Sequence, residues 1–208
     1  MVSPEDFSPV TLEDRGLFAS WYRAFPQLHS DNSFANMVCW NHYAHYRKAV
    51  VGDHLLLSST VAGETRFRFP IGPCDEGMTR EVLRLSLRAG GSTPFVVFNG
   101  EDRTYLAGIC PDLVLHPFRS FFEYVYRTSD LATLPGKPYL TIRHQLNRFR
   151  RRCSSVTEAL GPGNREEVRE FLDRWCDWRD CETDPVLANE REAIHCALDH
   201  QEALGPEG

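Results

Sequence analysis

The residues with the clearest capacity for chemistry are cations in one short stretch that begins at Arg143. From there to position 152 the chain has five arginines, one histidine and no acid. Guanidinium groups bind phosphate oxygens through paired hydrogen bonds, so Arg143 and Arg148, with Lys137 upstream, could hold a phosphate or an RNA backbone. Tyr139 and Asn147 would then orient the ligand through hydrogen bonds.

The same stretch also has a structural interpretation. In an amphipathic helix, Leu140, Leu146 and Phe149 could face a core while the arginine stems lie along its edge with their charges in water. For the individual arginines the structural interpretation is the more economical. For the patch as a whole, an anion-binding role is equally well supported.

A second candidate group follows a predicted strand at 121–126. Tyr126 and Asp130 lie at its end, where α/β domains place groups that contact ligands. However, Tyr124 and Tyr126 alternate in the way of residues that fill a sheet face, and Asp130 would serve to cap a short helix. The structural interpretation is favoured for both residues.

Several familiar sites are missing from the sequence. The turn at Gly90-Gly91 follows a predicted helix and precedes a strand, the reverse of the order that a coenzyme A pyrophosphate site needs. There is no P-loop, dinucleotide fingerprint or serine nucleophile elbow. The spacing of Cys176, Cys181, His195 and Cys196 matches no zinc pattern. We therefore expect no cofactor and no metal, and the sequence identifies no catalytic residue.

Composition indicates a globular protein of ordinary kind. The 208 residues are 42% hydrophobic with a net charge of −6. The seven cysteines are scattered and form no CxxC pair, which favours reduced thiols in a cytoplasm. No apolar run approaches the roughly 18–20 residues that span a bilayer, and the first residues resemble no secretory signal. We expect a soluble, cytoplasmic protein without a transmembrane segment.

The first half of the chain predicts helices around a small sheet. A capping box at Thr11–Asp14 begins one helix, which Pro26 ends, and Ser33 begins another. Three short strands follow with turns between them, which predicts an antiparallel meander, and a helix comes next. The predicted strands are 46–51, 54–60 and 65–69, and the helix is 75–88.

The second half predicts crossover units. Strands at 94–98 and 121–126 alternate with helices at 101–109, 129–134 and 138–152. Antiparallel strands followed by crossovers predict an α/β fold, a mixed α+β sheet covered by helices. This order fits the GNAT acyltransferase fold.

A break at 161–164 separates two amphipathic helices from the rest. Such a pair cannot bury its apolar faces alone, so it must pack on the first domain or on a partner protein. If Trp175, Trp178 and Ile194 form an exposed patch, a missing lobe or a partner is implied. We predict a GNAT-like lobe at 1–156, a linker at 157–164 and the helical start of a second lobe at 165–208.

Several segments together resemble a known family. The segments that carry this resemblance are Glu123–Leu131, Leu134–Lys137, Arg143 with Asn147–Phe149, Ser33–Asn36 with Trp40, Phe69–Gly72, and Phe7 with Pro9 and Thr11–Asp14. In order and spacing they resemble the family named for the C-terminal domain of phosphatidylglycerol lysyltransferase, from about Phe7 to Phe149. The resemblance implies two tandem GNAT-like lobes, in a family whose characterised members move an amino acid from aminoacyl-tRNA to a lipid head group.

The sequence departs from the family pattern in two places. Where the family typically has Lys-Arg-Asn after the tyrosine, this chain has Ile142-Arg143-His144. It also ends at Gly208, after the helices that lead into the second lobe, so we expect a truncated member.

Two functions from different classes follow. One is aminoacyl or acyl transfer from an activated donor such as aminoacyl-tRNA to an amine or lipid acceptor. The other is a non-catalytic binding or assembly domain that keeps the fold but lacks the second lobe. RNA binding through the arginine run alone is a third reading, which the overall acidity disfavours. Donor, acceptor and oligomeric state stay open.

Overall fold

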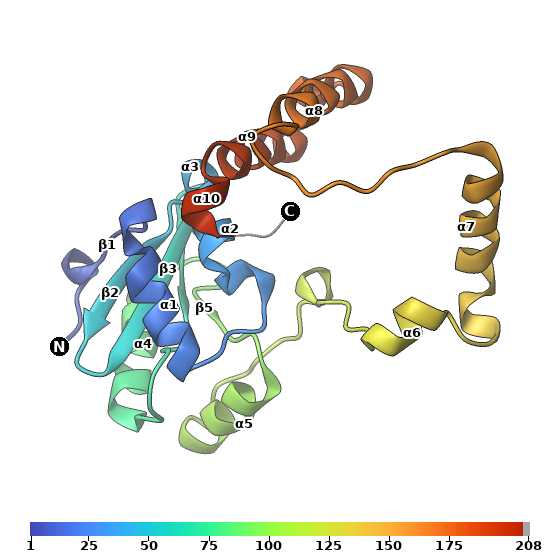
Figure 1. Ribbon diagram of the computed structural model, residues 1–208. Helices are drawn as coiled ribbons and strands as arrows, with labels where there is room; N and C mark the ends of the chain where they lie inside the picture. The colour runs from blue at the N-terminus through green and yellow to red at the C-terminus, as the bar shows by residue number, and fades with distance from the viewer. Residues whose placement is uncertain (206–208) are drawn as a thin grey trace. The chain divides into compact units, whose positions relative to one another are not determined.

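The computed structural model describes residues 1–205 and comprises two compact units. The first, here called the sheet unit, contains Met1–His116 and the described residues from Gly161 onward. The second, the helical unit, contains Pro117–Leu160. Figure 1 shows both, coloured along the chain.

The sheet has five strands in the order β1-β2-β3-β4-β5. The first three pairings are antiparallel, and β4 pairs with β5 in parallel. The predicted meander and the mixed α/β fold class are therefore confirmed, while β1 was not predicted. The strands are β1 (Ser8–Pro9), β2 (Arg47–Val51), β3 (His54–Val61), β4 (Glu64–Arg68) and β5 (Phe95–Val96).

Alternation along β3 divides the core into two layers, because successive side chains of a strand point to opposite faces. Leu55 and Leu57 pack with Phe18 and Met37 on one face, which three helices cover. Leu56 packs with Val82 and others on the second face, which one helix covers. The helices of the first face are α1 (Arg15–Ala24), α2 (Phe34–Cys39) and α3 (Asn41–Ala44), and that of the second is α4 (Glu76–Ala89).

Local signals placed these helices correctly. The Asp75 side chain accepts a hydrogen bond from Met78 N and caps α4, and Ser33 caps α2 in the same way through Asn36 N. The predicted capping box at Thr11 precedes α1, where it begins a short 3-10 turn. Helix α5 (Gly100–Ile109) follows β5 and is capped by Asn99.

The C-terminal helices pack on the sheet unit. They are α8 (Arg165–Arg179), α9 (Pro185–Asp199) and α10 (Gln201–Leu204). Cys39 of α2 is buried with Ala193 of α9 and Leu204 of α10. Arg15 Nη1 also donates to the carbonyl of Glu202 at 3.2 Å. The N- and C-terminal parts of the chain therefore share one core.

Trp175, Trp178 and Ile194 do not form one exposed patch on these helices. Trp175 and Ile194 pack against the buried cluster of Leu172, Cys176 and Cys181 between α8 and α9. Trp178, by contrast, is 77% exposed. The two helices therefore partly bury Trp175 and Ile194 between them and leave Trp178 on the surface.

The helical unit differs from the prediction at one point. It contains a 3-10 turn, η4 (Arg119–Phe121), then α6 (Thr128–Thr133), η5 (Lys137–Tyr139) and α7 (Leu140–Arg152). The predicted strand at 121–126 is wrong. A strand needs a hydrogen-bonded neighbour, and in the described residues none pairs with this segment. Tyr124 is 87% exposed and Val125 is 90% exposed.

Among the described residues, no helix has the length and apolar character needed to cross a membrane.

Candidate functional site

Arg143, a predicted anion ligand, contacts the turn before its own helix. Its Nη1 donates to the carbonyl of Gly136 at 2.7 Å and to that of Leu134. Leu134 has a φ of 47° and Gly136 one of 68°, so the turn holds two residues with positive φ, separated by Pro135. The guanidinium therefore donates to two carbonyls of the turn between α6 and η5. This arrangement supports a structural role for Arg143.

The other predicted residues of this segment lie on the surface of the helical unit. Lys137 and Tyr139 form η5, and Asn147 and Arg148 lie on α7. Lys137, Asn147 and Arg148 are exposed, and Tyr139 is half-buried. At about 100° per residue, Arg148 lies roughly 140° around the helix from Arg143. The structure therefore does not bring these two arginines to one face.

Helix α7 has an apolar stripe and a broad basic face. Ile142, Leu146 and Phe149 recur at i, i+4 and i+7 and are each exposed. The rest of the surface carries the cations, with Arg148 and Arg152 together on one side. None of the ion pairs in the described residues involves an arginine of α7. This face is an uncompensated positive surface, which attracts phosphates.

Tyr126 and Asp130 lie at the start of α6 rather than at the end of a strand. Tyr126 stacks on Tyr124 with ring centroids 6.4 Å apart, and both rings are exposed. Asp130 lies in the first turn of α6, but no side chain caps that helix. The expected capping role of Asp130 is therefore wrong, although its charge complements the helix dipole.

The sheet unit contains a cavity that sequence reasoning did not identify. It has a volume of about 270 Å³ and lies beside the end of β4 and the start of α5. Arg68, the last residue of β4, lines it and is only 5% exposed. Its guanidinium lies 5.0 Å from the ring centroid of Tyr46 and 5.5 Å from that of Phe98. Burial raises the pKa of Tyr46, and the charge of Arg68 opposes that shift.

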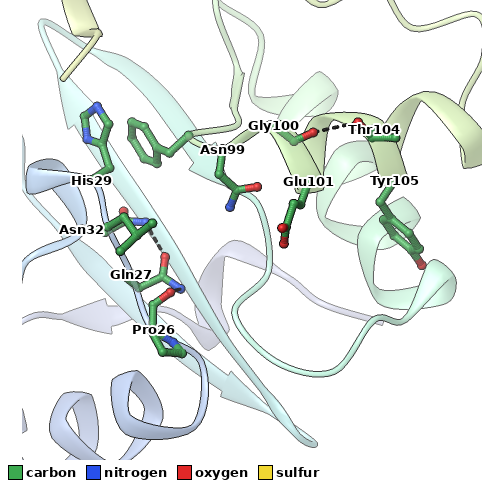
Figure 2. Close-up of a pocket in the computed structure, with 11 residues that line it drawn as sticks. Pro26, Gln27, His29, Asn32, Asn99, Gly100, Glu101, Thr104 and Tyr105 are labelled. Carbon is green, nitrogen blue, oxygen red and sulfur yellow. Dashed lines mark hydrogen bonds between the residues drawn. The ribbon is translucent and has the colours of Figure 1, made fainter. Parts of the chain in front are cut away.

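A wider pocket of about 920 Å³ shares one wall with this cavity. Figure 2 shows its two sides, the Pro26–Asn32 segment and the start of α5, with the Glu101 carboxylate and the Asn99 amide directed into the space between them. Six residues line both spaces: Pro26, Gln27, Asn32, Phe98, Asn99 and Glu101.

The polar groups of the cavity differ in whether they have hydrogen-bond partners. Asn32 Nδ2 donates to Gln27 Oε1 at 2.8 Å, but its buried Oδ1 has no hydrogen-bond partner. Asp102 accepts from Asn99 Nδ2 at 2.6 Å. Burial raises the pKa of Asp102, the Asn99 hydrogen bond lowers it, and the Glu101 charge raises it further. The cavity therefore combines a buried cation, an unsatisfied acceptor and carboxylates.

One sequence signal pointed near this cavity. The segment Phe69–Gly72 is one of those that carry the family resemblance, and all four of its residues line the cavity. A Cβ on Gly72 would lie 2.5 Å from the carbonyl oxygen of Asp53, so only glycine fits there. Arg68 immediately precedes this turn, but its burial has no local signature.

Comparison with known proteins identifies the family. The family model described as phosphatidylglycerol lysyltransferase, C-terminal, matches residues 22–208. The chain belongs to this family. The lysyltransferase-family chain is also similar to a solved structure, a conserved protein of unknown function from Bacteroides thetaiotaomicron VPI-5482, with a TM-score of 0.83 and 26% identity. The match covers 96% of this chain and 68% of that one. No protein of curated function matches.

Proposed function

We propose that this chain is a phosphatidylglycerol-lysyltransferase-like domain that binds a phosphate-bearing donor, such as aminoacyl-tRNA, and supports aminoacyl transfer to an amine or lipid acceptor. The observation that carries the proposal is the basic face of α7, whose arginines from Arg148 to Arg152 are exposed and form no ion pair in the described residues. The family supports a donor of this kind.

The chemistry asks little of the protein beyond positioning. The acceptor's nucleophile forms a bond to the carbonyl carbon of the aminoacyl ester, and the ribose oxygen leaves with a proton. Holding the two reactants together in the right orientation supplies much of the rate enhancement. In this proposal Arg148 and Lys137 hold donor phosphates, Tyr139 and Asn147 orient the donor, and Tyr126 and Asp130 lie beside it. Arg143 shapes the turn.

The proposal includes the organisation predicted above. Residues 1–156 would form a GNAT-like lobe, 157–164 a linker, and 165–208 the start of a second lobe, in a cytoplasmic protein. The packing of α9 on α2 joins the last of these segments to the first.

The test is binding of the full chain to charged and uncharged tRNA over a salt series. Arg148→Ala/Arg152→Ala should weaken binding and lower the slope of log K against log[salt] by about 0.7–0.9 per lost phosphate contact. Arg174→Ala, which removes an exposed arginine from α8, is the matched control and should change neither. Equal binding by wild type and the double variant would contradict the proposal.

The alternative is a non-catalytic binding or assembly domain, and the exposed stripe of Ile142, Leu146 and Phe149 favours it. Transfer of a labelled amino acid from charged tRNA to phosphatidylglycerol vesicles separates the two. Labelled lipid that depends on the α7 arginines supports transfer. Salt-sensitive tRNA binding without labelled lipid supports the binding domain.

A further inference from the structure

Arg68 is a buried cation without an acidic partner among the described residues. Its side chain lines the 270 Å³ cavity of the sheet unit, and it takes part in none of the ion pairs of the described residues. Apart from a side-chain hydrogen bond with Tyr46, its contacts are weak ones: Nη1 lies 3.6 Å from the sulfur of Met37, and the rings of Tyr46 and Phe98 lie near the guanidinium carbon. Removing a charge from water is costly unless hydrogen bonds or an opposite charge compensate it.

Aromatic contacts leave the hydrogen-bonding capacity of the guanidinium largely unused. Rings interact with its charge, whereas its five N–H groups project in the guanidinium plane and match a carboxylate bidentately. Because Arg68 also lines the cavity, a carboxylate inside the cavity could satisfy these donors. A ligand that fits the cavity is therefore a small organic molecule with a carboxylate group.

The hydrogen-bond acceptors that line the same cavity indicate the second group of the ligand. Asn32 is 4% exposed, lines the same cavity and has an Oδ1 that accepts no hydrogen bond. Glu101 also lines the cavity, and Figure 2 shows its carboxylate directed into the adjoining space. Asp102, by contrast, already accepts from Asn99. An acceptor and a free carboxylate together favour an ammonium group.

We propose that this cavity binds a small zwitterion of the α-amino-acid class, with its carboxylate on Arg68 and its ammonium on Asn32 Oδ1 and Glu101. The cavity volume of about 270 Å³ lies just below the range of sites for drug-sized ligands, roughly 300–1,000 Å³, which suits a smaller ligand of this kind. The adjoining pocket of about 920 Å³ gives room for a side chain beyond the common wall. The proposal goes beyond the tRNA-binding role of α7, because every residue it uses belongs to the sheet unit.

The test is thermal shift followed by calorimetry of the full chain with each of the 20 proteinogenic amino acids at millimolar concentration. At least one should raise the melting temperature of the wild-type protein. Arg68→Met should weaken its binding at least tenfold, because it removes the carboxylate partner. Arg103→Met, an exposed arginine of α5 outside both cavities, should bind like wild type.

Glu101→Gln tests the ammonium contact without a risk to folding, because Glu101 is exposed. It should weaken binding of the amino acid severalfold but leave unchanged the weaker binding of the matching carboxylic acid that lacks the amino group. No binding of any amino acid to the folded wild-type chain overturns the proposal. Equal affinity for the amino acid and its des-amino analogue, or undiminished binding by Arg68→Met, also overturns it.

The same preparations keep the two proposals apart. Arg68→Met should bind tRNA as the wild type does, and Arg148→Ala/Arg152→Ala should bind the amino acid as the wild type does. Loss of tRNA binding alone therefore bears on α7, and loss of amino-acid binding alone bears on the cavity.

Discussion

The guanidinium of Arg143 donates to the carbonyl of Gly136 at 2.7 Å, seven residues earlier in the chain. Since Gly136 has a positive φ and lies between α6 and α7, this contact joins the start of the long basic helix to the turn before it. Arg143, which the sequence offers as an anion ligand, thus already makes hydrogen bonds within the protein. Arg148 lies on a different side of α7 and is exposed.

The first prediction separates these two arginines. Arg143→Ala should increase amide hydrogen exchange in the first turns of α7, because a hydrogen bond that involves a charged group contributes about 1.5–3 kcal/mol. Arg148→Ala should leave exchange unchanged and reduce tRNA affinity. The measurement is hydrogen exchange with mass spectrometry on both single variants. Unchanged exchange in Arg143→Ala would argue against the structural role.

The second prediction compares two glycines. A Cβ at Gly72 would lie 2.5 Å from Asp53 O and 2.8 Å from His54 Cδ2, while one at Gly108 would meet nothing within 4 Å. Gly72→Ala should therefore destabilise the protein by about 1–3 kcal/mol, because the backbone must shift to make room. Gly108→Ala, within α5, should be neutral or stabilise it by about 0.5–1 kcal/mol. Urea unfolding of both variants gives the comparison, and a Gly72→Ala variant as stable as wild type would contradict the predicted clash.

The third prediction concerns stability in acid. The Arg191 hydrogen bond, at 2.8 Å, holds the pKa of Asp173 below its usual value, burial opposes this, and the charges of Arg191 and His195 assist it. Because the folded pKa is lower than the unfolded one, the contribution of Asp173 to stability is fully present above the unfolded pKa of about 4. It is lost as the pH falls through the folded pKa.

The variant Asp173→Asn removes this titration. Its melting temperature should fall below that of wild type between about pH 5 and 7, and the difference should shrink as the pH falls below about 4. Thermal unfolding of both proteins at steps of one pH unit measures this difference in melting temperature. A difference that stays constant down to pH 2 would show that the carboxylate does not stabilise the fold through its charge.

The fourth prediction concerns thiol reactivity. Burial and a hydrogen bond with Cys196 raise the pKa of Cys39 to about 12, and burial raises that of Cys176, beside Cys181, to about 11. Since the thiolate is the reactive form, these thiols should be nearly inert in the native protein at pH 8. Cys74 and Cys153 are exposed and should be alkylated first. Mass spectrometry after a short iodoacetamide pulse gives the order, and early labelling of Cys176 would contradict it.

Local chemistry in the sequence was enough to predict most of the secondary structure. Asp75 caps α4, Asp184 caps α9 before Pro185, and the turns after Val51 and Val61 join the three strands of the meander. Each of these signals involves residues close together in the chain, so the periodicity and the caps can be read without knowing the rest of the fold. The family also followed from the order of short segments.

Only the tertiary structure decided the features that depend on distant neighbours. The segment at 121–126 has the composition of a strand, but no described strand lies beside it to complete its hydrogen bonds. Arg68 is buried because Met37, Tyr46 and Phe98, from three separate parts of the chain, surround its guanidinium. Burial and pairing are properties of residues brought together by folding, and sequence spacing carries no measure of them.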